Sequence, residues 1–190
     1  MVYLGLALFA ALSLNLVFQF GLGLDSLGRM GNITVKIFGF RALTLFCSVM
    51  TVWIVIFYMP LSVGFMGNVL ILPLAVLSYC LYGNVLKRFF LAKEDTEEDY
   101  TRNGNGLSLA ASYLTLTLAS SPIGAAALAF GFSLGLFFFS LIIRKIERRS
   151  MLEAVPPSLR GSPLSLISIG LLSLIFSSAA ALLLGAFGIF

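Results

Sequence analysis

Apolar residues fill most of the chain in long runs, and short polar stretches separate these runs. A membrane-spanning helix needs about 20 apolar residues, because each residue adds about 1.5 Å of rise. The pattern therefore predicts an all-α integral membrane protein with a single transmembrane domain over residues 1–190. We expect six transmembrane helices, at about residues 2–24, 40–61, 65–86, 107–121, 123–143 and 163–187.

Two of the six predicted spans contain an interruption. The first span loses its regular pattern from Gly21 to Gly28, because a helix does not continue well through several glycines. The apolar run 107–143 is too long for one span and short for two, and it is broken at Ser120-Ser121-Pro122. We therefore expect broken or half-length helices at spans one and four, followed in the second case by a complete fifth span.

All twelve Lys and Arg residues lie in alternate connections, after the first, third and fifth predicted spans. The positive-inside rule places these connections in the cytoplasm and both chain ends outside. Three crossings reverse direction, so the two halves form a 3+3 inverted repeat, in which paired interruptions mark a functional centre. Glycine and other small residues that permit close helix packing explain the same interruptions equally well.

Composition supports a membrane protein. Hydrophobic residues make up 59% of the chain and charged residues 11%, against about 25% charged in a typical soluble domain. No nucleotide-binding loop, hydrolase motif or metal-ligand spacing is present, which argues against a water-soluble enzyme. The first apolar segment has no basic region before it, so we expect it to be retained as a span and not removed as a signal peptide.

Few residues offer chemistry within the membrane. The chain has no His, and Cys47 and Cys80 lie in apolar runs, which excludes ordinary zinc, haem-histidine and disulfide-framework sites. Asp25 is the one acid near a predicted helix end outside a charged run. An ionisable group in the membrane is usually functional, although at the interface Asp25 would only cap the following turn.

Two further patterns predict contacts with other groups. Ala7 and Ala11 form a small-residue stripe that could seat another helix. The cytoplasmic basic loop could attract anionic lipid head groups or an acidic partner, although membrane topology alone also accounts for its charge. Its cations are Arg144, Lys145, Arg148, Arg149 and Arg160.

The region 131–177 carries several motifs in a fixed order. A fifth span containing Gly and Phe ends in the arginine-rich turn 144–149, and a last span follows. Between and within them lie Val155-Pro156, Arg160-Gly161 and Gly170-Leu171-Leu172-Ser173-Leu174. This region resembles the C-terminal part of the RnfA (RsxA) subunit of Rnf electron-transport complexes, and its relative in the sodium-pumping NADH:quinone reductase. The length, the six spans and the paired broken helices extend the resemblance more weakly over the whole chain.

The resemblance implies a multi-pass subunit of the prokaryotic cytoplasmic (inner) membrane, with both ends outside. It would belong to a complex that couples electron transfer to Na⁺ or H⁺ transport, and it would not be catalytic alone. Its partners would be a homologous inverted membrane subunit of RnfE type, other Rnf-type subunits and the lipid bilayer, but no nucleic acid.

In that family each broken helix supplies a cysteine thiolate to a shared iron–sulfur cluster, for which thiolate is the usual ligand. The corresponding positions here look like Asp25 in the first break and Ser120 or Ser121 in the second. Neither Asp nor Ser is a good ligand for such a cluster. We therefore expect this chain to bind no cofactor by itself.

Two other functions fit a chain of this kind. A six-span substrate-binding subunit of a vitamin or small-molecule importer has a similar size and an Ala-rich first span that docks a partner. A non-redox assembly or structural subunit on the same scaffold is the other alternative, and the absence of the cluster cysteines makes it more credible.

Overall fold

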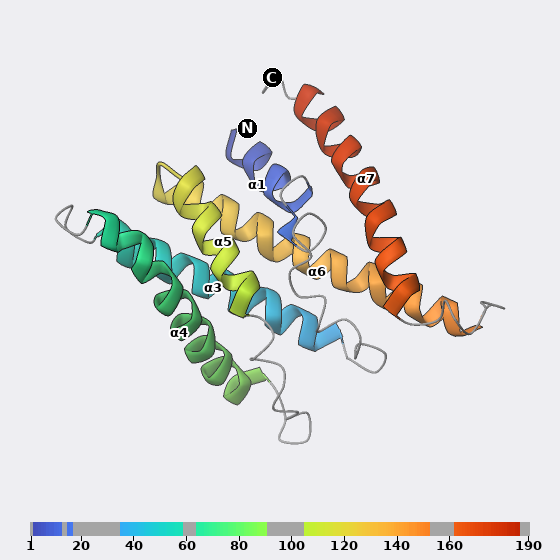
Figure 1. Ribbon diagram of the computed structural model, residues 1–190, viewed down its shortest axis with the longest axis horizontal. Coiled ribbons are helices and arrows are strands. Elements are labelled where there is room, and N and C mark those ends of the chain that lie inside the picture. Colours follow the sequence, from blue (N-terminus) through green and yellow to red (C-terminus); the bar gives the residue numbers. More distant parts are fainter. Residues whose placement is uncertain are drawn as a thin grey trace.

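The computed structural model describes residues 2–12, 15–16, 35–58, 64–90, 105–152 and 162–186, and all regular structure within them is helical. The all-α prediction is therefore confirmed for the described part of the chain. The helices, shown in Figure 1, are α1 (Val2–Leu12), α3 (Val35–Phe57), α4 (Gly64–Phe90), α5 (Asn105–Leu118), α6 (Pro122–Leu152) and α7 (Ser162–Ala186).

Three of these helices are long and apolar enough to cross a membrane. Their apolar segments are Phe38–Phe57 in α3, Val69–Phe89 in α4 and Pro122–Ile146 in α6. Helices α1 and α7 carry shorter apolar segments, Tyr3–Leu12 and Leu166–Leu182, and α5 has 14 residues. The lengths and compositions of α3, α4 and α6 indicate membrane association.

The outer surface of the bundle is rich in large apolar side chains. Phe89 is 80% exposed, Leu182 77% and Leu174 70%, and several other Leu, Ile and Val side chains on α4 and α7 are more than half exposed. Water-soluble monomers rarely expose apolar surface on this scale. A lipid environment would cover these side chains without cost, which agrees with the lengths of the three long helices.

Successive described helices from α3 to α7 run in alternating directions (Figure 1). The end of α3 and the start of α6 lie on one side of the molecule, as do the start of α1 and the end of α7. The start of α3 and the ends of α4 and α6 lie on the opposite side, where Arg41, Lys87, Arg88 and Arg149 are located. The described cations are thus gathered on one side.

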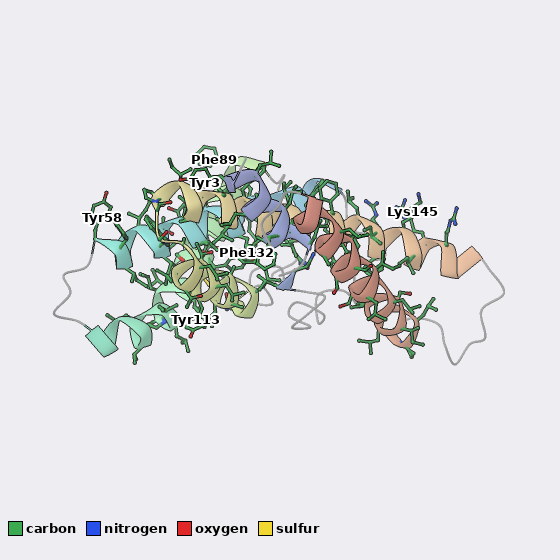
Figure 2. The ribbon with its side chains drawn as sticks, turned by 90° about the horizontal axis from the view of Figure 1, so that it is seen from above. Tyr3, Tyr58, Phe89, Tyr113, Phe132 and Lys145 are labelled. Carbon is green, nitrogen blue, oxygen red and sulfur yellow. The ribbon has the colours of Figure 1, made fainter. Side chains whose placement is uncertain are left out.

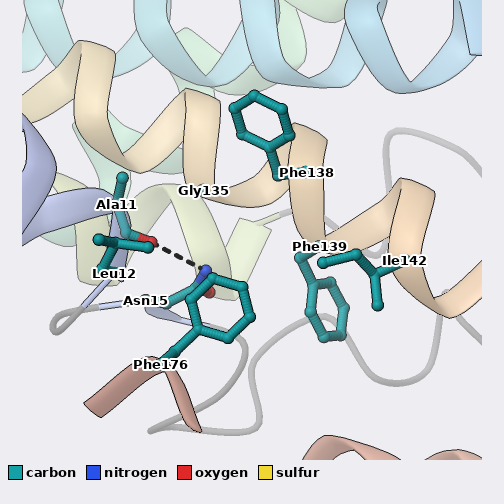
Figure 3. Close-up of a pocket in the computed structure, with 8 residues that line it drawn as sticks. All are labelled: Ala11, Leu12, Asn15, Gly135, Phe138, Phe139, Ile142 and Phe176. Carbon is teal, nitrogen blue, oxygen red and sulfur yellow. Dashed lines mark hydrogen bonds between the residues drawn. The ribbon is translucent and has the colours of Figure 1, made fainter. Parts of the chain in front are cut away.

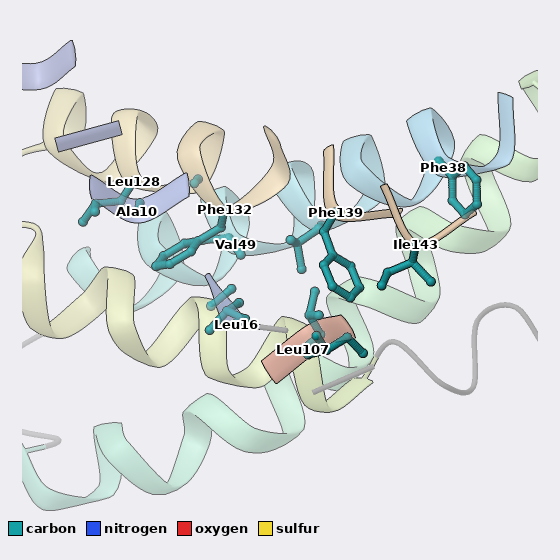
Figure 4. Packing of buried hydrophobic residues seen from close by; sticks show 13 residues of the cluster. Ala10, Leu16, Phe38, Val49, Leu107, Leu128, Phe132, Phe139 and Ile143 are labelled. Atoms are coloured by element: carbon teal, nitrogen blue, oxygen red, sulfur yellow. The ribbon is translucent and has the colours of Figure 1, made fainter. Parts of the chain in front are cut away.

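Helix α6 lies at the centre of the packing, because it contacts α1, α3, α5 and α7. Figure 4 shows the buried cluster that these contacts form, with Phe132 and Phe139 of α6 among its large members. The cluster also takes side chains from α1, α3 and α5, including Ala10, Val49 and Leu107. The core therefore joins residues that lie more than one hundred positions apart in the sequence.

Helix α1 approaches the backbone of α6 at two glycines. A Cβ atom at Gly131 would collide with the Ala7 carbonyl oxygen and lie 2.8 Å from Ala10 Cβ. A Cβ atom at Gly135 would lie 2.9 Å from the Ala11 carbonyl oxygen. Small residues permit this close approach of two helices. The predicted Ala7 and Ala11 stripe does seat a helix, and that helix belongs to the same chain.

We expect Gly131→Ala to destabilise the protein, although alanine ordinarily favours a helix over glycine by about 1 kcal/mol. The added methyl group has to push α1 away, and overpacking of this kind costs about 1–3 kcal/mol. The melting temperature of the purified protein in mild detergent should fall by roughly 2–12 °C.

Gly170→Ala is the matched control, because Gly170 is also helical but has no heavy atom within 4 Å of the position that its Cβ would take. This variant should melt at the wild-type temperature or slightly above it. Equal stability of the two variants would contradict close packing of α1 on α6.

Candidate functional site

Ser120 and Ser121 form the break between α5 and α6, at the interruption predicted from the sequence. Helix α5 ends at Leu118 and α6 begins at Pro122. The Ser121 carbonyl oxygen accepts the Ala125 N–H at 2.9 Å, and Ser121 Oγ accepts the Gly124 N–H at 3.1 Å. Ser121 therefore caps the N-terminus of α6, and Pro122 occupies the first helical position that proline favours. Ser120 is exposed.

The end of α1 is stabilised by a side chain that follows the helix. Asn15 lies outside α1, is 4% exposed, and donates a hydrogen bond from Nδ2 to the Ala11 carbonyl oxygen at 3.1 Å. The last carbonyls of a helix lack partners within it, so this bond satisfies one of them. A Cβ at Gly135 of α6 would lie 3.2 Å from Asn15 Nδ2. The absence of a side chain at Gly135 gives Asn15 its place against α6.

A pocket of about 190 Å³ lies beside the end of α1, between α1, α6 and α7 (Figure 3). Phe138 and Phe139 line it from α6, Phe176 lines it from α7, and Asn15 lies at its edge. Its wall is otherwise aliphatic. The pocket therefore offers no charged or metal-binding chemistry.

A cluster of serine hydroxyls joins α3, α4 and α5 in the interior. Ser48 Oγ lies 2.8 Å from Ser78 Oγ and 2.9 Å from Ser108 Oγ, and all three residues are buried. Ser78 Oγ and Ser108 Oγ also lie 3.0 and 3.3 Å from the Ala75 carbonyl oxygen. Three hydroxyl hydrogens thus serve four oxygen–oxygen contacts, so the hydrogens can redistribute among them. We call Ser48, Ser78, Ser108 and the Ala75 carbonyl the hydroxyl cluster.

Sequence reasoning did not find the hydroxyl cluster. Its one signal is the recurrence of small hydroxyl residues at helical spacing in apolar segments, at Thr44 and Ser48 of α3 and at Ser108 and Ser112 of α5. Thr44, Ser112 and Thr115 are buried and donate to carbonyl oxygens of their own helices. Such spacing places the residues on one face but does not identify the helix that they meet.

Among the described residues, the two cysteines form no site with other metal ligands. Cys47 of α3 and Cys80 of α4 are free thiols, and Cys80 Sγ lies 3.9 Å from Asn105 Oδ1. No group of three or more His, Cys, Asp or Glu residues that could hold a metal ion occurs in the part of the chain that the structure describes. The thiol at Cys80 therefore contacts a neutral amide.

The other predicted site residues fall into two groups. Asp25 and Arg160 lie outside the described residues, as does the predicted interruption from Gly21 to Gly28. Arg144, Lys145, Arg148 and Arg149 lie on the last turns of α6, because this helix continues to Leu152. The arginine-rich stretch that was predicted as part of a loop is therefore helical.

No family model, curated protein or solved structure matches this chain.

Ser121→Ala should lower the free energy of unfolding by about 1 kcal/mol, because it removes the cap of α6. Ser121→Asp should retain most of the stability, since a carboxylate also accepts the Gly124 N–H and favours a helix N-terminus. Reversible unfolding in mixed micelles with increasing sodium dodecyl sulfate measures the change. The control is Ser120→Ala, which removes an exposed hydroxyl and should leave stability unchanged; equal losses at Ser120 and Ser121 would contradict the capping role.

Ser48→Ala should destabilise the protein by about 0.5–1.5 kcal/mol, because it removes the hydroxyl that connects Ser78 with Ser108. The same assay on Ser108→Ala and on the double variant gives a double-mutant cycle. A loss of stability in the double variant that is smaller than the sum of the two single losses would show that the hydroxyls are coupled. Additive losses would show that they act independently. Thr117→Ala is the control, because its exposed hydroxyl bonds only to its own helix.

Proposed function

We propose that this chain is a membrane subunit of an ion-translocating electron-transport complex of Rnf or Nqr type, in which electron transfer is coupled to Na⁺ or H⁺ transport. The observation that carries the proposal is the motif order over residues 131–177. The chain would lie in a prokaryotic cytoplasmic membrane with both ends outside. It would act as a non-catalytic scaffold that packs against a homologous inverted subunit and the other Rnf-type subunits.

The pattern of helix contacts supports a 3+3 inverted repeat of α1, α3 and α4 with α5, α6 and α7. In such a repeat α1 corresponds to α5, α3 to α6 and α4 to α7. The contact between α1 and α6 then corresponds to the contact between α5 and α3. In the same way, the α3–α4 contact corresponds to α6–α7, and the α4–α5 contact corresponds to α7–α1. The α3–α6 contact corresponds to itself. All these contacts occur, although α3–α4 is much more extensive than α6–α7, and among the described residues α1 and α3 make no contact comparable to α5–α6.

The two short helices support the same arrangement. Helix α1 has 11 described residues and α5 has 14, so they are about 16 and 21 Å long, well below the 30 Å of a bilayer core. Each is the first helix of its half, and each packs through small residues on the long middle helix of the other half. For α1 these residues are Ala7 and Ala11 on α6, and for α5 the contact is Ser108 with Ser48 of α3.

The described residues at the second break do not fit an iron–sulfur cluster. Ser121 Oγ accepts a backbone N–H of α6, Ser120 is exposed, and neither carries the thiolate that such a cluster needs. The proposal therefore assigns no electron-transfer step to Ser120 or Ser121. In it, electrons pass through partner subunits, and this chain binds no cofactor alone.

The packing of Ala7 and Ala11 makes the importer the weaker of the two alternative functions. The importer reading relied on an Ala-rich first span that docks a partner, but Ala7 and Ala11 face Gly131 and Gly135 of the same chain. Because these alanines already pack on α6, they do not support the hypothesis that the first span docks an importer partner. A non-redox assembly or structural subunit is the second candidate, because the Ser121 hydroxyl caps α6 at the break.

The test is to purify the tagged chain from native membranes in mild detergent and to identify the co-purified proteins by mass spectrometry. We expect flavin- and iron–sulfur-bearing membrane subunits to be enriched over a mock purification from cells without the tag. Companion proteins that form an ATPase module would make the chain an importer subunit and would refute the proposal. Stoichiometric acid-labile sulfide in the chain purified away from its partners would separately refute the absence of a bound cluster.

A further inference from the structure

The last turns of α6 extend beyond the length that a bilayer core requires. Residues 122–143 precede the first cation and span about 33 Å at 1.5 Å per residue, close to the 30 Å hydrocarbon core. The helix nevertheless continues to Leu152. Arg144 and the cations after it therefore begin where the hydrocarbon ends. They extend over about 7.5 Å of helix axis, which matches the head-group layer on one side of a bilayer.

These cations share one face of the helix. At 100° per residue, Arg144, Lys145, Arg148 and Arg149 fall within a sector of about 140°. Phe139 and Ile143, which are buried in the core, lie on the opposite side. Lys145, Arg148 and Arg149 are exposed, and Figure 2 shows Lys145 directed away from the bundle. We call these four residues the basic face of α6.

Little negative charge in the described structure neutralises the basic face. Glu147 is the only acidic residue between Arg144 and Leu152, and no other Asp or Glu belongs to the described residues. Arg144 Nε is buried without a hydrogen-bond partner in the described structure. Arginine pairs well with phosphate, because its planar guanidinium can donate two parallel hydrogen bonds.

We propose that the basic face of α6 binds the phosphate groups of anionic phospholipids in the leaflet that borders it. The depth of the face favours lipid over an acidic protein, because its cations begin at the end of the apolar segment and not at a distance from the membrane. Opposite charge supplies the attraction, and the shared face lets several cations act on neighbouring phosphates. This inference depends on the membrane location of α6 but not on the electron-transport function.

The experiment measures lipid binding to the purified full-length chain in neutral detergent by native mass spectrometry. Phosphatidylglycerol should bind more tightly than phosphatidylcholine, and its binding should weaken as salt is added. Each cation near a membrane surface contributes about fivefold to binding. The double variant R148Q/R149Q should therefore bind phosphatidylglycerol roughly 25-fold more weakly, with phosphatidylcholine binding unchanged.

The matched control is K87Q/R88Q, which removes two cations from the last turn of α4 and should lower phosphatidylglycerol binding less than fivefold. Equal losses in the two variants would overturn the assignment to α6, as would equal binding of the two lipids to the wild-type chain. A partner protein lost from native membranes in R148Q/R149Q, with lipid binding intact, would assign the face to an acidic protein instead. If R148Q/R149Q does not fold, R148K/R149K takes its place. This variant must still prefer phosphatidylglycerol, and phosphatidylglycerol binding to the wild-type chain must weaken with salt. Failure of either result would overturn the proposal.

Discussion

The close approach of α1 to α6 is the contact on which the rest of the structure depends. Lipid tails are as apolar as leucine side chains, so helices in a bilayer gain little by hiding apolar surface from lipid and associate through close packing. Gly131 and Gly135 provide that packing, because the Ala7 and Ala11 carbonyls pass where side chains would otherwise stand. Helix α6 also contacts α3, α5 and α7, so displacement of α1 would disturb the centre of the bundle.

Helices α1 and α5 are attached to the rest of the bundle by different kinds of contact. Helix α1 meets α6 through bare backbone, whereas α5 meets α3 and α4 through the hydroxyl cluster of Ser48, Ser78 and Ser108. Hydrogen bonds between helices in a membrane contribute only about 0.6 kcal/mol on average. The hydroxyl cluster can redistribute its hydrogens without any movement of the helices.

Hydropathy predicted the helical class and the break at Ser120-Ser121-Pro122, because a run of apolar residues and a proline act locally. It could not predict the end of α1 at Leu12, since Leu14, Leu16 and Val17 continue the apolar pattern in sequence. The hydroxyl cluster was equally hidden, because Ser48, Ser78 and Ser108 each look like a small packing residue in an apolar run. Their meeting depends on how α3, α4 and α5 are arranged, which local sequence does not encode. The apolar pattern also predicted α6 to end near residue 143, although the basic residues that follow continue the helix to Leu152.

The cap at Ser121 explains how the chain forms the break between α5 and α6. Where a thiolate binds iron, the metal itself can hold the backbone open at a break. Here the Ser121 hydroxyl and the Pro122 ring define the start of α6 through contacts within a single turn. The contacts that define the break therefore lie within the chain itself. A break that is defined by contacts within the chain suits the scaffold role that the proposed function gives it.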